Sequence, residues 1–297
     1  MVRADKPEKL VWRTAEEAPP STILIRSPYD VEARYGKKRQ TEWTGYKVHL
    51  TETCDEDLPS LIINVETTDA TITDYEMTPV VQRHLADRGH LPSEHLVDTG
   101  YMSAVHLVHS VEQGIDLVGP VAPENSWQAQ AKEGFDSAAF VIDWEAQQAH
   151  CPQGHLSQKW QVRAGPQGPV LHFRFSRTDC GACPVRRRCT HSATLPRALT
   201  IYPQPAFEAL HAARQRQQRE EFWQRYARRA GIEGAMAQGN ARADLRHARF
   251  IGLTKTHLQH VCTALGLNVL RLGAWLAEIQ PHTTRPSPFA ALAPAVA

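Results

Sequence analysis

The sequence predicts an α/β fold in which a mixed core is interrupted by a mostly β segment and completed by helices. Three observations support this class. Up to residue 120, short apolar runs alternate with helical patterns, as in domains that pack helices on a sheet. Residues 121–205 lack this periodicity and are rich in aromatic residues, Pro, Gly and Cys. From residue 206 onward, apolar residues recur at helical spacing.

The predicted core opens with two strands, residues 43–50 and 61–65, joined by a polar turn. A helix follows over residues 79–87. Thr78 suits its N-cap and Pro79 its first position, because a helix leaves the first N–H unpaired and proline has none. The apolar face of this helix would consist of Val80, Val81 and Leu85.

A strand, a helix and another strand are predicted around Asp98. Residues 94–97 form the strand that ends at Asp98, and residues 103–113 form a helix with Ser103 as its N-cap. The apolar residues at 115–118 predict a short buried strand. The core up to residue 120 therefore has the order strand, strand, helix, strand, helix, strand.

The C-terminal part is predicted to be helical. Residues 206–232 carry Arg and Gln on one face, and residues 253–279 form a long helix with an apolar stripe. We expect this stripe to pack in the core; a partner surface is the alternative. It comprises Leu258, Val261, Cys262, Leu265, Val269, Leu272 and Leu276. The tail from Gln280, rich in Pro and Ala, is expected to be disordered.

Composition limits the class of protein. The chain has 297 residues, of which 42% are hydrophobic and 22% charged, and its net charge is +1. These values are ordinary for a soluble globular protein. The N-terminus is polar, and no apolar run approaches the ~18 residues that span a bilayer. These features argue against a membrane protein and favour a cytoplasmic one.

The charges are unevenly distributed. Residues 52–98 contain eleven acidic residues against Arg83 and Arg88, a balance of −9. Residues 211–271 contain ten arginines and Lys255 against four acidic residues, a balance of +7. A basic C-terminal part favours binding of a polyanion, and a solvated helix face is the alternative.

Two acidic residues stand out by their context. Asp98 ends an apolar strand and begins the run Asp-Thr-Gly-Tyr, whereas Glu233 ends the pattern Tyr226-x2-Arg229-x3-Glu233. On one helix these last three side chains would fall at about 0°, 300° and 340°. Carboxylates bind Mg²⁺ or Mn²⁺, and two such ions about 4 Å apart can hold both reacting oxygens of a phosphodiester. A plain Asp-x-Gly turn is the alternative for Asp98.

The motifs resemble, in kind and order, those of bacterial insertion-sequence transposases of the DDE type. The resemblance is to the branch with a Tyr-x2-Arg-x3-Glu-x6-Lys signature and a cysteine-bearing insertion, and it covers nearly the whole chain. The matching segments are residues 27–35, 45–49, 97–101, 229–234 and 246–255.

The resemblance implies an RNase H-like core that performs metal-dependent phosphodiester hydrolysis and strand transfer on double-stranded DNA. It implies Asp98 and Glu233 as catalytic ligands of Mg²⁺ or Mn²⁺, with Tyr226 and Arg229 positioning a phosphate. Contacts to the DNA backbone would come from Arg246, Arg249 and Lys255, for which a solvated basic face is the alternative. A homodimer is compatible with this reading.

Two features depart from the family pattern. Asn240 stands where the signature has lysine, which leaves one phosphate contact open. These enzymes also use a first carboxylate, followed by Ser-Thr or Gly-Thr on the first strand, and no such motif precedes Gly45. We therefore expect an incomplete copy, truncated at its N-terminus, with catalysis absent or severely impaired. Asp30 is the alternative first carboxylate, although Pro28 argues against a central strand there.

The predicted domains follow from these motifs. An RNase H-like core that lacks its first strand is interrupted by a zinc-ribbon-like insertion. The boundaries are residues 1–26 for a polar lead-in, 27–120 for the N-terminal part of the core, 121–205 for the insertion, 206–280 for the helical C-terminal part of the core and 281–297 for the disordered tail.

The insertion contains a set of cysteines with zinc spacing. Cys-x2-Cys lets two thiolates bind one tetrahedral Zn²⁺, and two further cysteines complete four ligands. The four are Cys151, Cys180, Cys183 and Cys189. His155 or His191 is an alternative ligand, and reduced cysteines of a decayed site are the alternative to zinc. The metal would be structural. Cys54 and Cys262 stand alone and are expected to be buried hydrophobic residues.

Three functions remain open at this point. The first is an incomplete DDE-type transposase, the second a non-catalytic remnant that binds DNA or a transposase, and the third a product without a role. The sequence contains no Walker P-loop, no G-x-S-x-G elbow and no H-E-x-x-H motif.

Overall fold

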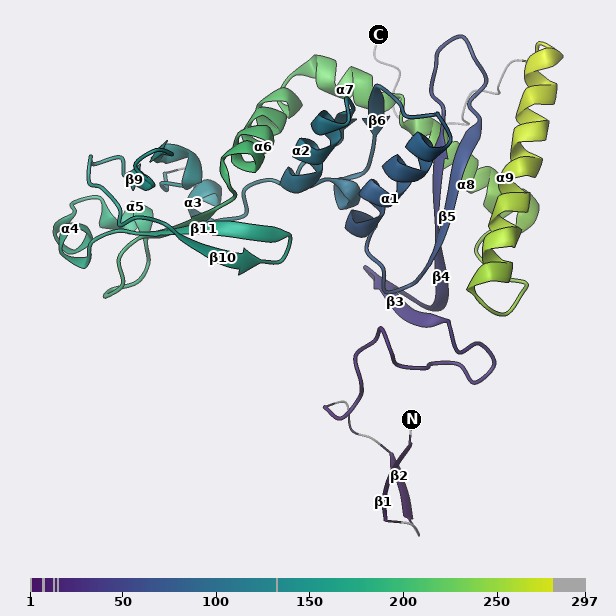
Figure 1. Ribbon diagram of the computed structural model, residues 1–297, viewed down its shortest axis with the longest axis horizontal. Helices are drawn as coiled ribbons and strands as arrows, with labels where there is room; N and C mark the ends of the chain where they lie inside the picture. The colour runs from purple at the N-terminus through teal and green to yellow at the C-terminus, as the bar shows by residue number, and fades with distance from the viewer. Residues whose placement is uncertain (1, 7–8, 13, 15, 132, 280–297) are drawn as a thin grey trace, which may run out of the picture. The chain divides into compact units, whose positions relative to one another are not determined.

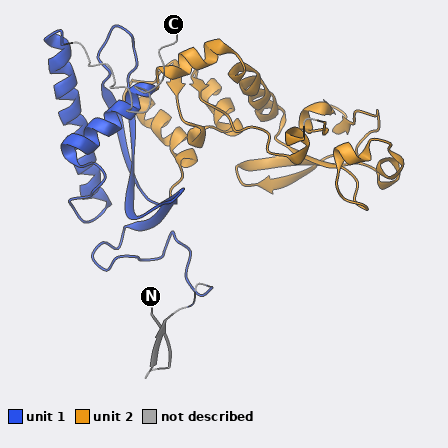
Figure 2. Ribbon diagram, turned by 180° about the vertical axis from the view of Figure 1, so that it is seen from behind, with its two compact units in different colours: residues 1–71, 230–297 blue, residues 72–229 orange. Residues whose placement is uncertain are grey.

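The computed structural model describes the chain except for residues 1, 7–8, 13, 15, 132 and 280–297. The predicted tail lies outside the described residues. The chain divides into two compact units (Figure 2). Unit 1 comprises Met1–Thr71 and Ala230–Ala297, and unit 2 comprises Ile72–Arg229. Each unit is mixed α/β, as the sequence predicts. The predicted domain boundaries remain predictions.

Unit 1 is built on a three-stranded antiparallel sheet with two helices (Figure 1). Its strands are β3 (Arg34–Lys38), β4 (Thr41–Glu52) and β5 (Ile62–Asp69), in the order β3-β4-β5. Its helices are α8 (Ala230–Ala243) and α9 (Leu253–Leu276). A separate hairpin, β1 (Val2–Lys6) and β2 (Lys9–Trp12), precedes them. The strands predicted at 43–50 and 61–65 are confirmed as parts of β4 and β5.

The core of unit 1 forms where α8 and α9 meet β5. Its buried residues are Ile62, Ala235, Ala264 and Leu267. The side chain of Asn268 fixes the register of α9 on β5, because it accepts a hydrogen bond from the Ile62 N–H and donates one to the Ile62 carbonyl, both at 2.8 Å. Small residues on both helices allow this close packing.

The prediction that the apolar stripe of α9 packs in the core is wrong. Every residue of that stripe is exposed, including Cys262. The face that packs on the unit is instead polar in part, with Thr256, Gln259 and His260 buried beside Ala264 and Leu267. Helical spacing identifies an apolar face but not what covers it, so the pattern alone could not decide between core and partner surface. Cys54 is half-buried.

Unit 2 begins with α1 (Asp74–Asp87), β6 (Glu94–Leu96), the 3₁₀ turn η1 (Thr99–Tyr101), α2 (Ala104–Glu112) and β7 (Asp116–Val118). The strands β6 and β7 pair in parallel, with α2 as the crossover between them. The strands and the α2 helix agree with the prediction. The core here comprises Val97, Met102, Leu107, Leu117, Val121 and Ala213.

The N-terminus of α1 lies earlier than predicted. Thr73 is the N-cap, and it forms a capping box with Glu76, so two backbone N–H groups are satisfied reciprocally. Thr78, the predicted cap, is instead buried inside the helix, where its hydroxyl donates to the Tyr101 carbonyl at 2.8 Å. Pro79 lies in the helix interior. The position of the helix N-terminus is therefore set by the Thr73-x2-Glu76 capping box and not by the preference of Pro79 for the first turn of a helix.

The predicted N-cap of α2 is confirmed. The hydroxyl of Ser103 accepts a hydrogen bond from the His106 N–H at 3.0 Å. The ring of His106 stacks on Tyr75 of α1, with 4.2 Å between centroids. These contacts join α1, η1 and α2 around the segment that follows Asp98.

The middle of unit 2 contains short strands and three short helices. These are α3 (Trp127–Gln130), β8 (Val141–Asp143), β9 (Gln148–His150), β10 (Gln161–Gly165), β11 (Gly168–Arg174), α4 (Arg177–Ala182), α5 (Arg186–Cys189) and β12 (Ala198–Ile201), with a 3₁₀ turn at Ser137–Ala139. The strands β10, β11 and β12 form an antiparallel sheet.

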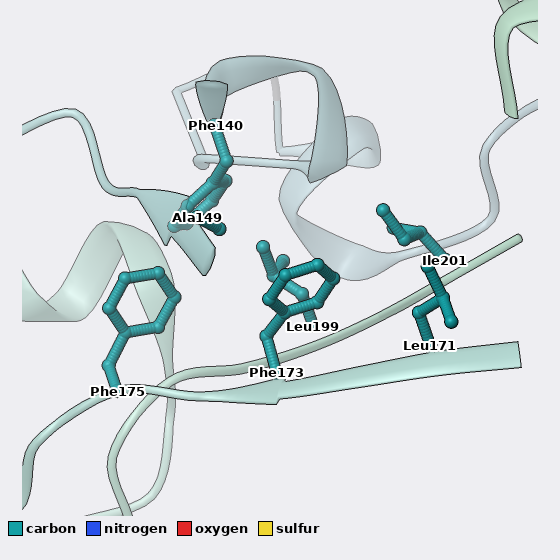
Figure 3. Packing of buried hydrophobic residues seen from close by; sticks show 7 residues of the cluster. All are labelled: Phe140, Ala149, Leu171, Phe173, Phe175, Leu199 and Ile201. Carbon is teal, nitrogen blue, oxygen red and sulfur yellow. The ribbon is translucent and has the colours of Figure 1, made fainter. Parts of the chain in front are cut away.

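An aromatic core holds this middle segment together. The side chains of β11 and β12 meet Phe140 and Ala149 across a small cluster (Figure 3). Phe173 is fully buried at its centre. Outer contacts include Trp144 and Trp160. Aromatic side chains bury a large area per residue, which suits a segment with few regular elements.

The helices α6 (Gln204–Gln217) and α7 (Glu220–Ala227) complete unit 2. Ala209, Leu210 and Ala213 of α6 pack on the cluster around β6 and β7. In the described part of the chain, β6 pairs only with β7, and β4 pairs only with β3 and β5.

Candidate functional site

Asp98 lies directly after a buried strand end. The Val97 N–H donates to the Val118 carbonyl at 2.8 Å, which extends the pairing of β6 with β7 up to this point. Asp98 then occupies the N-cap position of η1, without a side-chain cap hydrogen bond. Its side chain is 49% exposed, so an ion in solution can reach the carboxylate.

Two members of the predicted signature contact this carboxylate. Arg229 donates from Nη2 to Asp98 Oδ2 at 2.6 Å, and the Tyr226 hydroxyl donates to Asp98 Oδ1 at 3.2 Å. The Arg229 side chain is only 18% exposed. The sequence predicted that these residues position a phosphate, but it contained no signal that they would contact Asp98. The structure thus joins two motifs that are 128 residues apart.

The prediction of one continuous helix through Tyr226, Arg229 and Glu233 is wrong. The helix α7 ends at Ala227 and α8 begins at Ala230. Between them, the Arg228 and Arg229 N–H groups bond to carbonyls three residues back, which tightens the backbone as in a 3₁₀ turn. The angles expected for a single helix therefore do not apply. Glu233 is exposed in the first turn of α8, in unit 1.

An ion-pair network that the sequence did not predict anchors α7. Arg225 donates to Glu94 and, at 2.7 Å, to Asp116; Arg228 also donates to Glu94. Arg216 of α6 donates to Asp116 at 2.7 Å. Burial alone would raise the pKa of Asp116, but the two guanidinium groups outweigh it and lower that pKa. The network holds α7 beside β6 and β7, and thereby holds Tyr226 and Arg229 at Asp98.

The uneven distribution of charge along the sequence is the feature from which ion pairs of this kind could have been predicted. Part of the basic segment is neutralised by the acidic segment of the same chain, because oppositely charged side chains pair when the fold brings them together. Arg271 is likewise paired within unit 1, with the buried Glu52 at 2.8 Å. Only part of the net charge of +7 in residues 211–271 is therefore available to bind a polyanion.

A carboxylate missed by sequence reasoning lies close to the Asp-x-Gly-Tyr turn. A Cβ at Gly100 would lie 3.0 Å from Oδ2 of Asp74, so a larger residue there would have to displace this carboxylate by a few tenths of an ångström. Burial raises the pKa of the Tyr101 hydroxyl, and the charges of Asp74 and Asp98 raise it further. Asp74 and Asp98 thus flank the same turn.

The predicted DNA contacts lie in unit 1. Arg246 and Arg249 are in the loop of residues 244–252, and Lys255 is in the first turn of α9. All three are exposed, and no ion pair involves them among the described residues. The buried Gln259 holds the loop, because it accepts from the Arg249 N–H at 2.8 Å and donates to the His247 carbonyl at 3.0 Å.

The glycines beside Glu233 have different environments. A Cβ at Gly231 would lie 2.6 Å from Oε1 of Glu52, whereas one at Gly234 would meet nothing within 4 Å. Close approach therefore explains Gly231 and not Gly234. The side-chain carbonyl of Asn240, at the signature's lysine position, is buried and has no hydrogen-bond partner among the described residues.

Asp30 is a structural residue rather than an open metal ligand. Its carboxylate accepts from the Tyr46 hydroxyl at 2.8 and 2.9 Å and from the Gly252 N–H at 3.0 Å, besides two N–H groups of its own loop. Glu32 accepts from the Leu253 N–H at 2.7 Å. Both carboxylates thus satisfy the N-terminus of α9. Burial would raise the pKa of Asp30, but these hydrogen bonds lower it.

The four predicted zinc ligands line one pocket in unit 2. Cys151, Cys180, Cys183 and Cys189 share its wall with His155 and Asp179. His191 instead packs against the Trp127 ring, with 3.7 Å between centroids. Burial raises the pKa of Cys189 to about 11. The three other cysteines also raise this pKa, whereas the positive charge of Arg197 lowers it.

The thiols share this pocket without forming a finished ligand set. In the described part of the chain, no group of three or more His, Cys, Asp or Glu side chains is arranged to hold a metal ion. Asp98 belongs to unit 2 and Glu233 to unit 1, so each carboxylate is described within its own unit.

The described helices include none that is both long and apolar enough to cross a membrane.

Comparison with known proteins gave one result. The searches of curated proteins and of solved structures found no match. A family model described as "Transposase DDE domain" matches residues 150–273, which is less than half of the chain. This range contains Tyr226, Arg229 and Glu233, together with the basic loop and all four cysteines of the pocket. Over these residues the chain is similar to DDE transposase domains, and the match supports a transposase.

Proposed function

We propose that this chain is an incomplete DDE-type transposase that binds double-stranded DNA and does not carry out strand transfer. The observation that carries the proposal is the contact of Tyr226 and Arg229 with Asp98. A chance coincidence of motifs would not bring the acidic residue of one motif into hydrogen-bonding distance of two residues of the other. A protein acting on bacterial DNA would work in the cytoplasm.

An RNase H-like core is part of this proposal. The antiparallel β4 and β5 are followed by α1, β6, α2 and β7, with β6 and β7 parallel. This order is the one expected of such a core without its first strand. The first strand would also carry the first carboxylate, so Asp98 and Glu233 would be two of the three carboxylates that the resembled enzymes use.

We propose Asp98 and Glu233 as the remaining ligands for Mg²⁺ or Mn²⁺. Oxygen ligands suit both ions. The Arg229 guanidinium already pairs with Asp98 and has further N–H donors for a phosphate oxygen. Arg229 can therefore position a DNA phosphate beside Asp98. With two carboxylates in place of three, we expect no productive two-metal geometry.

Arg246, Arg249 and Lys255 are the proposed DNA-backbone contacts. Exposed cations that are not neutralised within the chain release counterions when they meet phosphates. Phe250 and Ile251, next to Arg249, are also exposed and offer apolar surface to a base or sugar. A structural Zn²⁺ in the cysteine pocket and a homodimer complete the proposal.

Binding of a duplex of random sequence by wild type and by the Arg246→Glu, Arg249→Glu double variant tests the DNA interface. We expect the Kd to rise about 10- to 100-fold at low salt, and the slope of log K against log salt to fall by about 2. Arg39 and Arg83 are exposed arginines elsewhere. Their double reversal to Glu changes the net charge equally and should leave the Kd within about twofold. Equal losses in both double variants would contradict a specific interface.

The absence of catalysis is tested in the same preparation. Supercoiled plasmid incubated with Mn²⁺ should be nicked no faster by wild type than by Asp98→Asn. Nicking or strand transfer that disappears in Asp98→Asn would refute the proposal of an inactive copy. A non-catalytic remnant is the second candidate, favoured by the lack of a preformed metal group among the described residues. It predicts that Asp98→Asn also leaves Mn²⁺ binding, measured by electron paramagnetic resonance, unchanged.

A further inference from the structure

The outer face of α9 is an apolar stripe that the rest of the described chain does not cover. Leu258, Val261, Leu265, Val269, Leu272 and Leu276 are between 38% and 67% exposed. At 100° per residue they lie within about 80° of one another around the helix. Monomeric proteins rarely expose a contiguous apolar patch of this kind, and such patches mark interaction sites.

This face bears no charge. The charged residues of α9 are Lys255, in its first turn, and Arg271, whose guanidinium points inward to the buried Glu52. A partner therefore finds neither attraction nor repulsion by charge along the stripe. Two copies of the same face can approach each other without a like-charge penalty, whereas a partner chosen by opposite charge has nothing to recognise.

The stripe is also symmetric in sequence about Leu265. Leu258 and Leu272 lie seven residues before and after it, and Val261 and Val269 lie four residues before and after it. A two-fold contact requires that residue i of one copy meets residue j of the other, and j meets i. An antiparallel pair of α9 helices satisfies this requirement with like residues: Leu258 meets Leu272, Val261 meets Val269, and Leu265 meets itself.

The area agrees with a weak but specific dimer. A leucine or valine side chain presents about 100 Å² of apolar surface when fully exposed. Six residues that are about half exposed, with Trp275 at the edge of the stripe, therefore offer on the order of 400 Å² per copy. About 800 Å² over both copies is smaller than a standard interface and suits a weak, transient contact with a dissociation constant on the order of tens of micromolar.

We propose that two copies of this chain associate through α9, antiparallel, with the two-fold axis at Leu265. The interface deepens the homodimer of the proposed function and rests on the exposure and symmetry of this helix, whereas DNA binding and catalysis are measured separately from dimerisation.

Sedimentation of the full chain between about 1 and 100 µM tests the contact, and we expect a monomer–dimer equilibrium in this range. Leu265→Glu should weaken dimerisation at least 100-fold, because two carboxylates meet at the axis. Leu58 is a comparably exposed leucine of unit 1 away from α9. Leu58→Glu should leave the equilibrium unchanged. The proposal is overturned if the wild-type chain stays monomeric over this whole concentration range, as it would if its own C-terminal residues covered the stripe. It is also overturned if Leu265→Glu leaves the dimerisation constant unchanged.

A charge swap tests the antiparallel register. In the Leu258→Glu, Leu272→Lys double variant, the carboxylate introduced at position 258 meets the ammonium group introduced at position 272 of the other copy, so this variant should still dimerise. The Leu258→Glu, Leu272→Glu variant should be monomeric. In a parallel pair, position 258 meets position 258, and both variants would fail. If only the Leu258→Glu, Leu272→Lys variant dimerises, the antiparallel register is supported, and α9 is shown to fold with two added charges. If neither variant dimerises, the antiparallel register is overturned.

Discussion

Single residues near Glu233 show why a motif and its environment must be considered together. Gly231 and Gly234 both belong to α8, and from sequence both suggest close approach of another group. Only Gly231 has such a neighbour, the Glu52 carboxylate, which is held by Arg271. Glycine lowers the stability of a helix relative to alanine, so it is expected only where a neighbouring group leaves no room for a side chain. Of these two glycines, only Gly231 has such a neighbour.

The pair of glycines predicts opposite effects of the same substitution. Gly231→Ala should lower the free energy of unfolding by about 1–3 kcal/mol, because its methyl group displaces the pinned Glu52 from Arg271. Gly234→Ala has open space and should raise the free energy of unfolding by up to about 1 kcal/mol through helix propensity. Urea denaturation of both variants measures the difference, and equal effects at the two sites would count against the Glu52 explanation.

At the scale of elements, two segments that resemble transposase motifs have a structural role that the sequence did not predict. The segment of Asp30 and Glu32 satisfies the N-terminus of α9, whose first residues belong to the later motif with Lys255. Gly252 lies in the left-handed region, at φ 94°, and brings its N–H to Asp30. The earlier segment therefore caps the helix that the later segment begins.

The cysteine-lined segment predicts an effect of metal removal. If Zn²⁺ joins the four thiols, purified wild type should contain about one zinc per chain, and a chelator should remove several kcal/mol of stability from this segment. Cys183→Ser should bind no zinc, whereas Cys54→Ser, outside the pocket, should bind as wild type does. Atomic absorption and thermal unfolding with and without chelator provide the readout. A chain that unfolds identically with and without chelator, and carries no zinc after reconstitution, contradicts the zinc site.

At the scale of the whole molecule, histidines with lowered pKa values in both units predict sensitivity to acid. Burial, and after it the charge of the neighbouring His257, lowers the pKa of His260 from 6.5 to about 4. Burial lowers the pKa of His95, in unit 2, to about 4 as well. Each neutral histidine stabilises the fold above pH 6.5. That contribution is lost as pH falls towards 4, because the unfolded chain binds the proton first.

His260→Gln tests this dependence. The free energy of unfolding of wild type should fall by about 1–3 kcal/mol more than that of the variant between pH 6.5 and 4, and the difference should level off below pH 4. The window lies above the range in which Asp30 and Asp116, whose pKa values are lowered, take up protons. His90→Gln, at an exposed site, is the control. Parallel pH profiles for wild type and His260→Gln would rule out this histidine as the cause.

The sequence by itself determined the α/β class, most strands and helices and the cap of α2, whereas the roles of the candidate site residues remain predictions. These features depend on neighbours in the chain, through alternation, helical spacing and capping side chains. The resemblance of the motifs to DDE transposases was also readable in sequence, and the family model supports it for residues 150–273.

Only the tertiary structure decided what each face and charge meets. Sequence could not show that Arg229 pairs with Asp98, that Arg225 anchors α7, or that Asp30 caps α9, because these partners lie 131, 131 and 222 residues apart. It also could not show that the stripe around Leu265 is exposed, since spacing identifies an apolar face without its cover. Ion pairs and buried surfaces form between segments that the whole fold brings together, and no local pattern contains that information.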